Sequence, residues 1–195
     1  MIEVRVRSKS SVIGRQDDIY FNLTTQTKMN NKPTIRDFVT TDYEAVNRVA
    51  STAWNQYAMD FKDWDGLARF VANTALLAAD AELIIAERDG EVVGVVGYVG
   101  PGRPRESVFP PDWGIIRMLS VLPSERGQGI GRLLTQACIA RAQQDGAITI
   151  GLHTSPVLRS ALDLYLRMGF QFHKTIPDRR GAPYAVYALT IGQST

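Results

Sequence analysis

The stretch SERGQGIGRLL, residues 124–134, carries the strongest local signal in the chain. Three glycines, Gly127, Gly129 and Gly131, stand where apolar residues begin to recur at helical spacing. Glycine loses more backbone entropy on folding than other residues and is a poor helix former. A simple turn into a helix needs one such residue, so the cluster indicates a second purpose.

The cluster joins a predicted strand to the N-terminus of a predicted helix. Such a terminus presents backbone N–H groups without helical partners and a partial positive charge, and glycines let an anion approach them closely. The sequence therefore predicts a phosphate or pyrophosphate site. A P-loop does not fit, because Arg132 and Leu133 follow Gly131. A dinucleotide-binding turn does not fit either, because the glycine spacing differs and the acidic residue about twenty positions later is missing.

The six residues that begin at Arg126 read Arg-Gly-Gln-Gly-Ile-Gly. They resemble the acetyl-CoA signature of the GNAT superfamily of N-acyltransferases, which is (Arg/Gln)-x-x-Gly-x-(Gly/Ala). The context MLSVLPSERGQGIGRLL is similar to that family's strand, proline turn, signature and helix, and ALDLYLRMGF is similar to its next helix. The resemblance covers residues 33–190 in element order and is motif-specific over residues 118–170.

The resemblance implies an α/β fold with a central mixed, mostly antiparallel sheet, splayed at the cofactor strand and flanked by helices on both faces. It also implies transfer of an acetyl group from acetyl-CoA, a co-substrate, to an amine of a small molecule or peptide. Attack would be direct, in a ternary complex, without a metal. The positions that match the family's cofactor-binding residues are Leu119, Val121, Arg126, Gly127, Gln128, Gly129, Ile130, Gly131 and Arg132.

Within that set, the resemblance assigns different contacts to the two segments. Backbone N–H groups of residues 127–132 are expected to hold the pyrophosphate. The backbone at Leu119 and Val121 is expected to pair with the pantetheine arm. The side chain of Arg126 pairs with phosphate in this interpretation, and the alternative is that it faces water.

Tyr165 matches the family's general acid, which protonates the CoA thiolate as it leaves. Its helix also carries an apolar stripe, so the alternative is a core aromatic. Where many family members have Asn, this chain has Leu158, and Ser155 is an alternative source of a hydroxyl for the cofactor.

The sequence does not identify the general base. The candidates are Asp112, Glu82 and His153, and water could also relay the proton. The rival to an enzyme is a catalytically inactive CoA-binding sensor or interaction module of the same fold.

Regular patterns begin at Pro33 and give the element order β-α-α-β-β-β-α-β-α-β-β. TTDY supplies caps for the first helix, and a second helix is predicted over residues 66–77. Asp89-Gly90 predicts a hairpin turn. The strand–helix–strand unit over residues 114–153 predicts a right-handed crossover between parallel strands. The buried face of its helix is predicted to consist of Ile130, Leu133, Leu134, Ala137 and Cys138.

Three segments rich in aromatic or charged residues are expected to select the acceptor: residues 54–64, 101–113 and 177–184. Their aromatic side chains would line an acceptor pocket, close the edges of the core or form a homodimer contact: Trp54, Tyr57, Phe61, Trp64 and Trp113. Arg179 and Arg180 would meet an acidic acceptor or face water.

The composition is that of a soluble globular protein. The 195 residues carry a formal net charge of +2, which predicts neither a nucleic-acid nor a membrane partner. The single cysteine, Cys138, predicts a buried structural thiol. No apolar run approaches the roughly 18 residues of a membrane span, and the N-terminus lacks a signal-peptide core, so a cytoplasmic location is expected.

Residues 1–32 are polar and lack sustained periodicity, so they are expected to form an N-terminal extension, disordered or loosely attached. Met29 is an alternative natural start. Residues 33–195 are expected to form the N-acetyltransferase domain that the resemblance implies.

Overall fold

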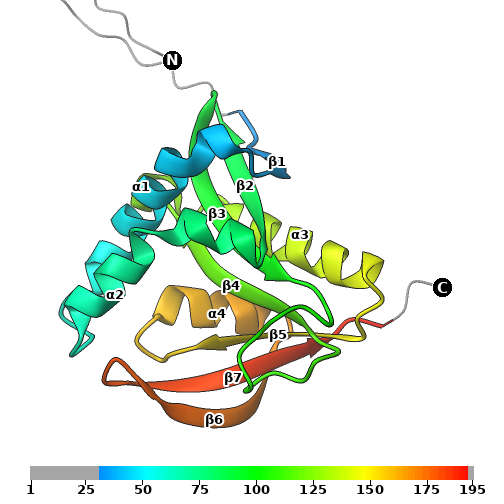
Figure 1. Ribbon diagram of the computed structural model, residues 1–195. Coiled ribbons are helices and arrows are strands. Elements are labelled where there is room, and N and C mark those ends of the chain that lie inside the picture. Colours follow the sequence, from blue (N-terminus) through cyan, green and yellow to red (C-terminus); the bar gives the residue numbers. More distant parts are fainter. Residues whose placement is uncertain (1–30, 193–195) are drawn as a thin grey trace, which may run out of the picture. The chain divides into compact units, whose positions relative to one another are not determined.

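A computed structural model describes residues 31–192, so the extension expected over residues 1–32 lies, up to residue 30, outside the described residues. Over the described range, seven strands form one sheet in the order β1-β2-β3-β4-β5-β7-β6 (Figure 1). Neighbouring strands are antiparallel except β4 and β5, which are parallel. The predicted mixed, mostly antiparallel sheet is therefore confirmed. The strands are β1 (Thr34–Asp37), β2 (Glu82–Arg88), β3 (Glu91–Val99), β4 (Gly114–Val121), β5 (Thr149–Thr154), β6 (Gln171–Arg179) and β7 (Ala182–Thr190).

Helices cover both faces of the sheet, as predicted. The α-helices of the described range are α1 (Tyr43–Trp54), α2 (Trp64–Val71), α3 (Ile130–Gln144) and α4 (Arg159–Arg167). Successive residues of a strand point to opposite faces. In β2, Ile85 packs into the core that contains Val49 of α1, whereas Ile84 packs into the core that contains Leu134 of α3. Figure 1 shows α1 and α2 together on one side of the sheet and α3 on the other.

The parallel pair β4–β5 is short, and this opens the sheet. Within the described residues, the register joins only Gly114 with Ile150 and Ile115 with Gly151. Beyond these pairs the two strands diverge, and both line a cavity. The predicted parallel pairing is confirmed, and so is the splay of the sheet at β4.

The turn between β2 and β3 also follows its prediction. Asp89 and Gly90 have φ values of 54° and 81°. Two successive positive φ values are typical of the tight hairpin turn that Asp-Gly favours.

The helix predicted over residues 66–77 is wrong at both ends. It begins earlier, because the side chain of Asp63 accepts a hydrogen bond from the first turn of α2 and caps it. It ends earlier, because Asn73 Nδ2 donates to the carbonyl of Arg69 at 2.8 Å. A side chain that bonds the preceding turn competes with helix continuation. A separate 3₁₀ helix, η3 (Thr74–Ala79), follows.

Two details of the other helices also differ from the prediction. Asp42 precedes α1, but its carboxylate accepts from the N–H of Val39 and from Arg36 instead of capping that helix. In α3, Leu133 is 38% exposed, although it belongs to the predicted buried face. Thr135 is buried in its place, because its hydroxyl donates to a carbonyl of the same helix at 2.8 Å and needs no water.

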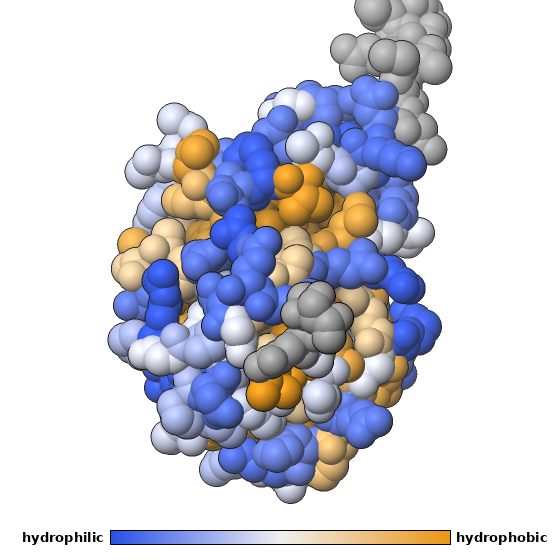
Figure 2. All heavy atoms as spheres, turned by 90° about the vertical axis from the view of Figure 1, so that its right-hand side faces the viewer, coloured by the Kyte–Doolittle hydropathy of each residue, from blue (hydrophilic) through white to orange (hydrophobic). Residues whose placement is uncertain are grey.

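The surface is mostly polar on the face that Figure 2 presents. Hydrophilic side chains cover most of that face, and hydrophobic side chains gather between them in several smaller groups. Among residues 31–192, no helix has both the length and the apolar character that a membrane span requires.

Candidate functional site

The glycine turn, residues 126–132, leads from η4 (Pro123–Glu125) into α3. Gly127 and Gly129 have φ values of 76° and 81°, in the left-handed region that favours glycine. A Cβ atom built on either residue would meet no atom within 4 Å, so the space over the turn is open. No side chain of the described residues caps the N-terminus of α3. The first N–H groups of this helix are therefore available to an anion.

A buried ion pair supports the glycine turn. Arg88 is the last residue of β2, and its Nη1 lies 2.5 Å from Glu125 Oε2, with both side chains less than a tenth exposed. The same guanidinium donates to the side-chain oxygen of Gln128. The side chain of Gln128 therefore points toward Arg88. The backbone N–H of Gln128 is the group left for a ligand.

The guanidinium of Arg126 connects the glycine turn to α1. Its Nη2 donates to the carbonyl of Ala53 at 3.0 Å, and its Nη1 donates to Gln56 Oε1 at 2.8 Å. Its Nε donates to the carbonyl of Val121 at 3.3 Å. Arg126 also lines the cavity, and its predicted contact with phosphate stays a prediction.

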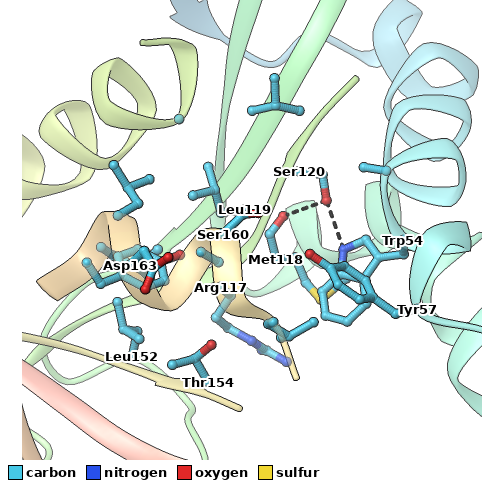
Figure 3. A pocket seen from close by; sticks show the side chains of 18 of the residues that line it. Trp54, Tyr57, Arg117, Met118, Leu119, Ser120, Leu152, Thr154, Ser160 and Asp163 are labelled. Carbon is cyan, nitrogen blue, oxygen red and sulfur yellow. Dashed lines mark hydrogen bonds between the residues drawn. The ribbon is translucent and has the colours of Figure 1, made fainter. Parts of the chain in front are cut away.

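The open edge of β4 carries Leu119 and Val121, which are half-buried and line the cavity. The residue before Leu119 is strained, because Met118 has φ of 53°. Its carbonyl accepts a hydrogen bond from the Ser120 hydroxyl, which in turn accepts from the indole N–H of Trp54 (Figure 3). A register shift between β3 and β4 accompanies the strain. Such irregularities re-aim backbone groups, and nothing in the sequence pattern predicted this one.

The cavity measures about 950 Å³ and lies where β4 and β5 diverge. The glycine turn lines part of it, which we call the turn region. Another part, the hairpin region, is lined by residues near the β6–β7 hairpin and the loop before β4: Glu106, His153, Arg179, Arg180 and Tyr184.

The aromatic residues expected at the acceptor divide into two groups. Trp54, Tyr57 and Phe61 line the cavity, as the sequence predicted. Trp64 and Trp113 do not line it. The Trp113 ring instead meets His173 edge-on at 5.0 Å between ring centroids. The sequence thus indicated segments that contribute to the cavity, but only the folded structure shows which of their aromatic rings line it.

Tyr165 lines the cavity from α4 and is 5% exposed. Its ring meets Phe170 edge-on, with centroids 5.5 Å apart. Burial raises its pKa well above the usual value for a phenol. Its hydroxyl makes no hydrogen bond with any residue between 31 and 192. Tyr165 is thus both a core aromatic and a cavity residue, with a protonated hydroxyl available to a ligand.

His153 and Glu106 form the polar centre of the hairpin region. His153 Nε2 lies 3.4 Å from Glu106 Oε1, and the guanidinium of Arg179 forms an ion pair with Glu106. These two partners, His153 first, lower the pKa of Glu106 to about 2. His153 stacks on Phe109, with centroids 5.8 Å apart. Its Nδ1 is sealed from solvent and has no partner among the described residues.

Of the three candidate bases, His153 lines the cavity, whereas Asp112 and Glu82 do not. Glu82 pairs with Arg141 at 2.7 Å outside it. Sequence reasoning missed Glu106. The signal available was its position within residues 101–113, one of the segments expected to select the acceptor, but a solvated loop carboxylate has the same appearance.

Two further side chains that the sequence singled out are buried outside the cavity. Cys138 is fully buried on α3, and burial raises the pKa of its thiol, so the prediction of a structural thiol is confirmed. Ser155 is also fully buried, and its Oγ accepts from the N–H of Val157 at 3.2 Å. It is therefore not exposed to a cofactor in the cavity. Leu158 is 7% exposed and lines the cavity.

An open strand edge, a glycine turn at an uncapped helix N-terminus and a shared cavity are the features that a site for a long ligand with an anionic group requires. The chain belongs to the acetyltransferase (GNAT) family, whose model matches residues 33–170. Among residues 31–192, no group of three or more His, Cys, Asp or Glu side chains could hold a metal ion.

Relatives and solved structures agree with this membership. N-acetyltransferase 8F1 of Rattus norvegicus is 33% identical over 100 residues, which is 49% of this chain and 42% of that protein. Mycothiol acetyltransferase of Streptomyces avermitilis is 30% identical over 95 residues, which is 49% of this chain and 29% of that protein. The chain thus spans less than half the length of these two relatives.

Among solved structures, PaiA N-acetyltransferase of Thermoplasma acidophilum, in complex with coenzyme A, superimposes with a TM-score of 0.67 and 15% identity. The match covers 82% of this chain and 99% of that one. At this identity the likeness shows the fold, and it agrees with the predicted sheet and helices.

Proposed function

We propose that the protein transfers an acetyl group from acetyl-CoA to an amine of a small molecule or peptide, by direct attack in a ternary complex. The observation that carries the proposal is the open edge of β4, which lies beside the glycine turn and lines the same cavity. A thioester cofactor with an amide-bearing arm and a pyrophosphate needs a strand edge and a cluster of N–H groups together. Family membership and the CoA-bound neighbour support the same assignment.

The cofactor residues expected from the sequence are consistent with this arrangement. Backbone N–H groups of residues 127–132 bind the pyrophosphate, supported by the open space over Gly127 and Gly129. The backbone at Leu119 and Val121 pairs with the pantetheine arm as a neighbouring strand would. Because these contacts use the backbone, the side chains of Leu119 and Val121 can pack in the core.

The reaction follows from where the thioester would lie. The amine lone pair attacks the thioester carbonyl carbon, and the carbonyl oxygen takes up negative charge. A backbone N–H near the strained Met118 polarises that oxygen, since irregular backbone frees such groups from the sheet. The carbon–sulfur bond then breaks, and the electron pair leaves with sulfur as a thiolate.

Tyr165 donates a hydrogen bond and then a proton to the departing thiolate. Its raised pKa keeps the phenol protonated before the reaction, so the proton is always present. Its hydroxyl has no competing partner among the described residues, which supports this role.

His153 accepts the proton that the amine loses. A proton on Nε2 toward Glu106 leaves Nδ1 as the accepting nitrogen, and the Glu106 carboxylate stabilises the imidazolium that forms. Because Nδ1 is sealed in the protein alone, the acceptor or a water molecule must enter beside it. His153 is therefore our choice among the bases that the sequence left open.

The test uses purified protein, acetyl-CoA and a panel of amines that includes amino acids, polyamines, aminoglycosides and peptide N-termini. Release of free thiol is followed together with the mass of the acetylated product. Turnover of any amine supports the proposal. Calorimetric binding of CoA without turnover of any amine would instead identify the inactive CoA-binding module, and absence of CoA binding would overturn both.

The remaining expectations extend this proposal. We propose that residues 33–195 form the catalytic domain, that the protein is cytoplasmic, and that it forms a homodimer through its aromatic segments. Sedimentation measured with and without acetyl-CoA tests the homodimer, and intact mass from the native source tests the start of the chain.

A further inference from the structure

Arg117 on β4 is a cavity guanidinium without a counter-charge. It is half-buried and lines the cavity, yet it makes no hydrogen bond or ion pair with any residue between 31 and 192. Figure 3 shows its side chain extending from β4 toward the segment that carries Thr154. An arginine stays charged at any physiological pH, so a half-buried one without an anion is unusual and calls for a partner.

The hairpin region does not supply that partner. Arg179 forms an ion pair with Glu106, and Arg180 forms one with Asp63. Each of these two guanidinium groups therefore has its own carboxylate. Arg117 has no such carboxylate among the described residues, and its half-buried charge favours a negative group on whatever enters the cavity beside it.

The cofactor's phosphates are poorly placed to serve Arg117. The glycine turn follows the Val121 end of β4, and Arg117 lies four residues earlier, or about 13 Å along the strand. Two other unpaired arginines of the cavity, Arg132 and Arg167, are exposed on α3 and at the end of α4. Arg132 begins next to the turn and is better placed for phosphate.

We infer that Arg117 binds a carboxylate of the acceptor, so that the substrate is an amine that also carries a carboxylate, as an amino acid does. The inference rests on the proposed acetyl transfer. The planar guanidinium matches a carboxylate with two parallel hydrogen bonds, and one positive charge balances one carboxylate. Thr154 is 2% exposed and its hydroxyl has no partner among the described residues, so it can donate to the same group.

The rest of the acceptor is apolar. Trp54, Tyr57, Phe61 and Met118 line the cavity together with Arg117. Such walls favour an aliphatic or aromatic body on the acceptor. The acceptor class is therefore a hydrophobic amino acid or a derivative that keeps its amine and carboxylate.

The experiment compares matched amines that differ only in the carboxylate: phenylalanine against 2-phenylethylamine, and leucine against 3-methylbutylamine. For each pair, kcat/KM is measured by thiol release with the wild type, Arg117→Gln and Arg117→Lys. Differences in the intrinsic reactivity of the two amines are the same for every variant. The change in the preference for the carboxylate therefore reports Arg117 alone.

The wild type is expected to prefer the amino acid, and Arg117→Gln to lose about 10- to 100-fold of that preference, the range for a hydrogen bond to a charged group. Arg117→Lys keeps part of it, because an ammonium supplies the charge without the planar fork. Arg48→Gln removes an exposed charge from α1 outside the cavity and should leave the preference unchanged. Circular dichroism and CoA calorimetry verify that each variant is folded.

Three results would overturn the inference. The preference could survive in Arg117→Gln, CoA affinity could fall in that variant by as much as the preference does, or the panel could be acetylated only at amines without a carboxylate. In each case acetyl transfer itself stands. Failure of the wild type to acetylate any amine would remove the proposed function as well, and the two outcomes are therefore distinct.

Discussion

The turn region and the hairpin region of the cavity are built in different ways. The turn region offers backbone N–H groups from one continuous stretch, residues 126–132. The hairpin region offers side chains that come from a loop, a strand and a hairpin far apart in sequence, Glu106, His153 and Arg179. A backbone site depends on local conformation, whereas a side-chain site depends on the whole fold. The first keeps its chemistry through most substitutions, and the second changes its selectivity with each one.

The largest effect is expected at Tyr165, which lines the cavity and which we propose as the general acid. Tyr165→Phe removes the hydroxyl that we propose as the proton donor to the thiolate but keeps the ring that packs against Phe170. General acid steps contribute about 10²- to 10⁴-fold, so kcat should fall in that range. Steady-state thiol release measures it. Tyr187→Phe, outside the cavity with its ring against Phe172, is the matched control. A wild-type kcat in Tyr165→Phe would leave only a packing role.

The next largest effect is expected at His153, where a role as a base can be distinguished from a role in positioning the acceptor. His153→Gln should lower kcat/KM by about 10²-fold near neutral pH, since the amine loses its proton acceptor. The loss should shrink as pH rises toward the pKa of the amine, about 8 to 10, because more of the amine is then free before attack and hydroxide can take the proton that the adduct still has to lose. A pH profile of kcat/KM measures both. His173→Gln, on exposed β6 and outside the cavity, is the matched control. A pH-independent loss would indicate a positioning role.

A smaller effect tests whether the turn region works through its backbone. Gly129 and Gly90 share φ of 81°, and a Cβ at either position meets nothing within 4 Å. Alanine at either position should therefore cost the same strain, about 1 kcal/mol, seen as a similar fall in Tm. Only Gly129→Ala adds a methyl group at the proposed phosphate site, and CoA affinity should therefore fall by about tenfold in calorimetry. Equal CoA affinity in both variants would remove the phosphate contact from this turn.

The sequence was sufficient for features that depend on local conformation. The Asp89-Gly90 hairpin, the glycine turn and the alternation of buried side chains between the two faces of β2 each depend on a few neighbouring residues. The element order and the parallel pair follow from them, together with the family resemblance. This is why the fold could be predicted closely and the errors fell at helix ends.

Features that depend on distant contacts could not be predicted in the same way. The end of α2 is an exception, because the hydrogen bond from Asn73 to the carbonyl of Arg69 is local, but helical periodicity does not show which side chain makes such a bond. The strain at Met118 accompanies a register shift between β3 and β4, and the alternation of a strand does not show where such a shift falls. The pairing of Glu106 with His153 joins positions 47 residues apart, which no periodicity predicts. Most of the hairpin region therefore became visible only in the folded chain.

The smallest effect is electrostatic and should distinguish the two regions by pH. His153 and Arg179 hold the pKa of Glu106 near 2, below the usual 4.5, so its charged form stabilises the fold. That stabilisation is complete above about pH 5 and is lost as the pH falls from there through 2. The Glu106 side chain is 35% exposed, so solvent screening limits it to about 1 kcal/mol. Glu106→Gln should therefore lower the urea midpoint at pH 7, and the difference from wild type should narrow at pH 3.5. Glu91→Gln, whose side chain is 75% exposed, should show little difference at either pH. If the difference in urea midpoint between wild type and Glu106→Gln stayed constant with pH, Glu106 would stabilise the hairpin region by packing and not by its charge.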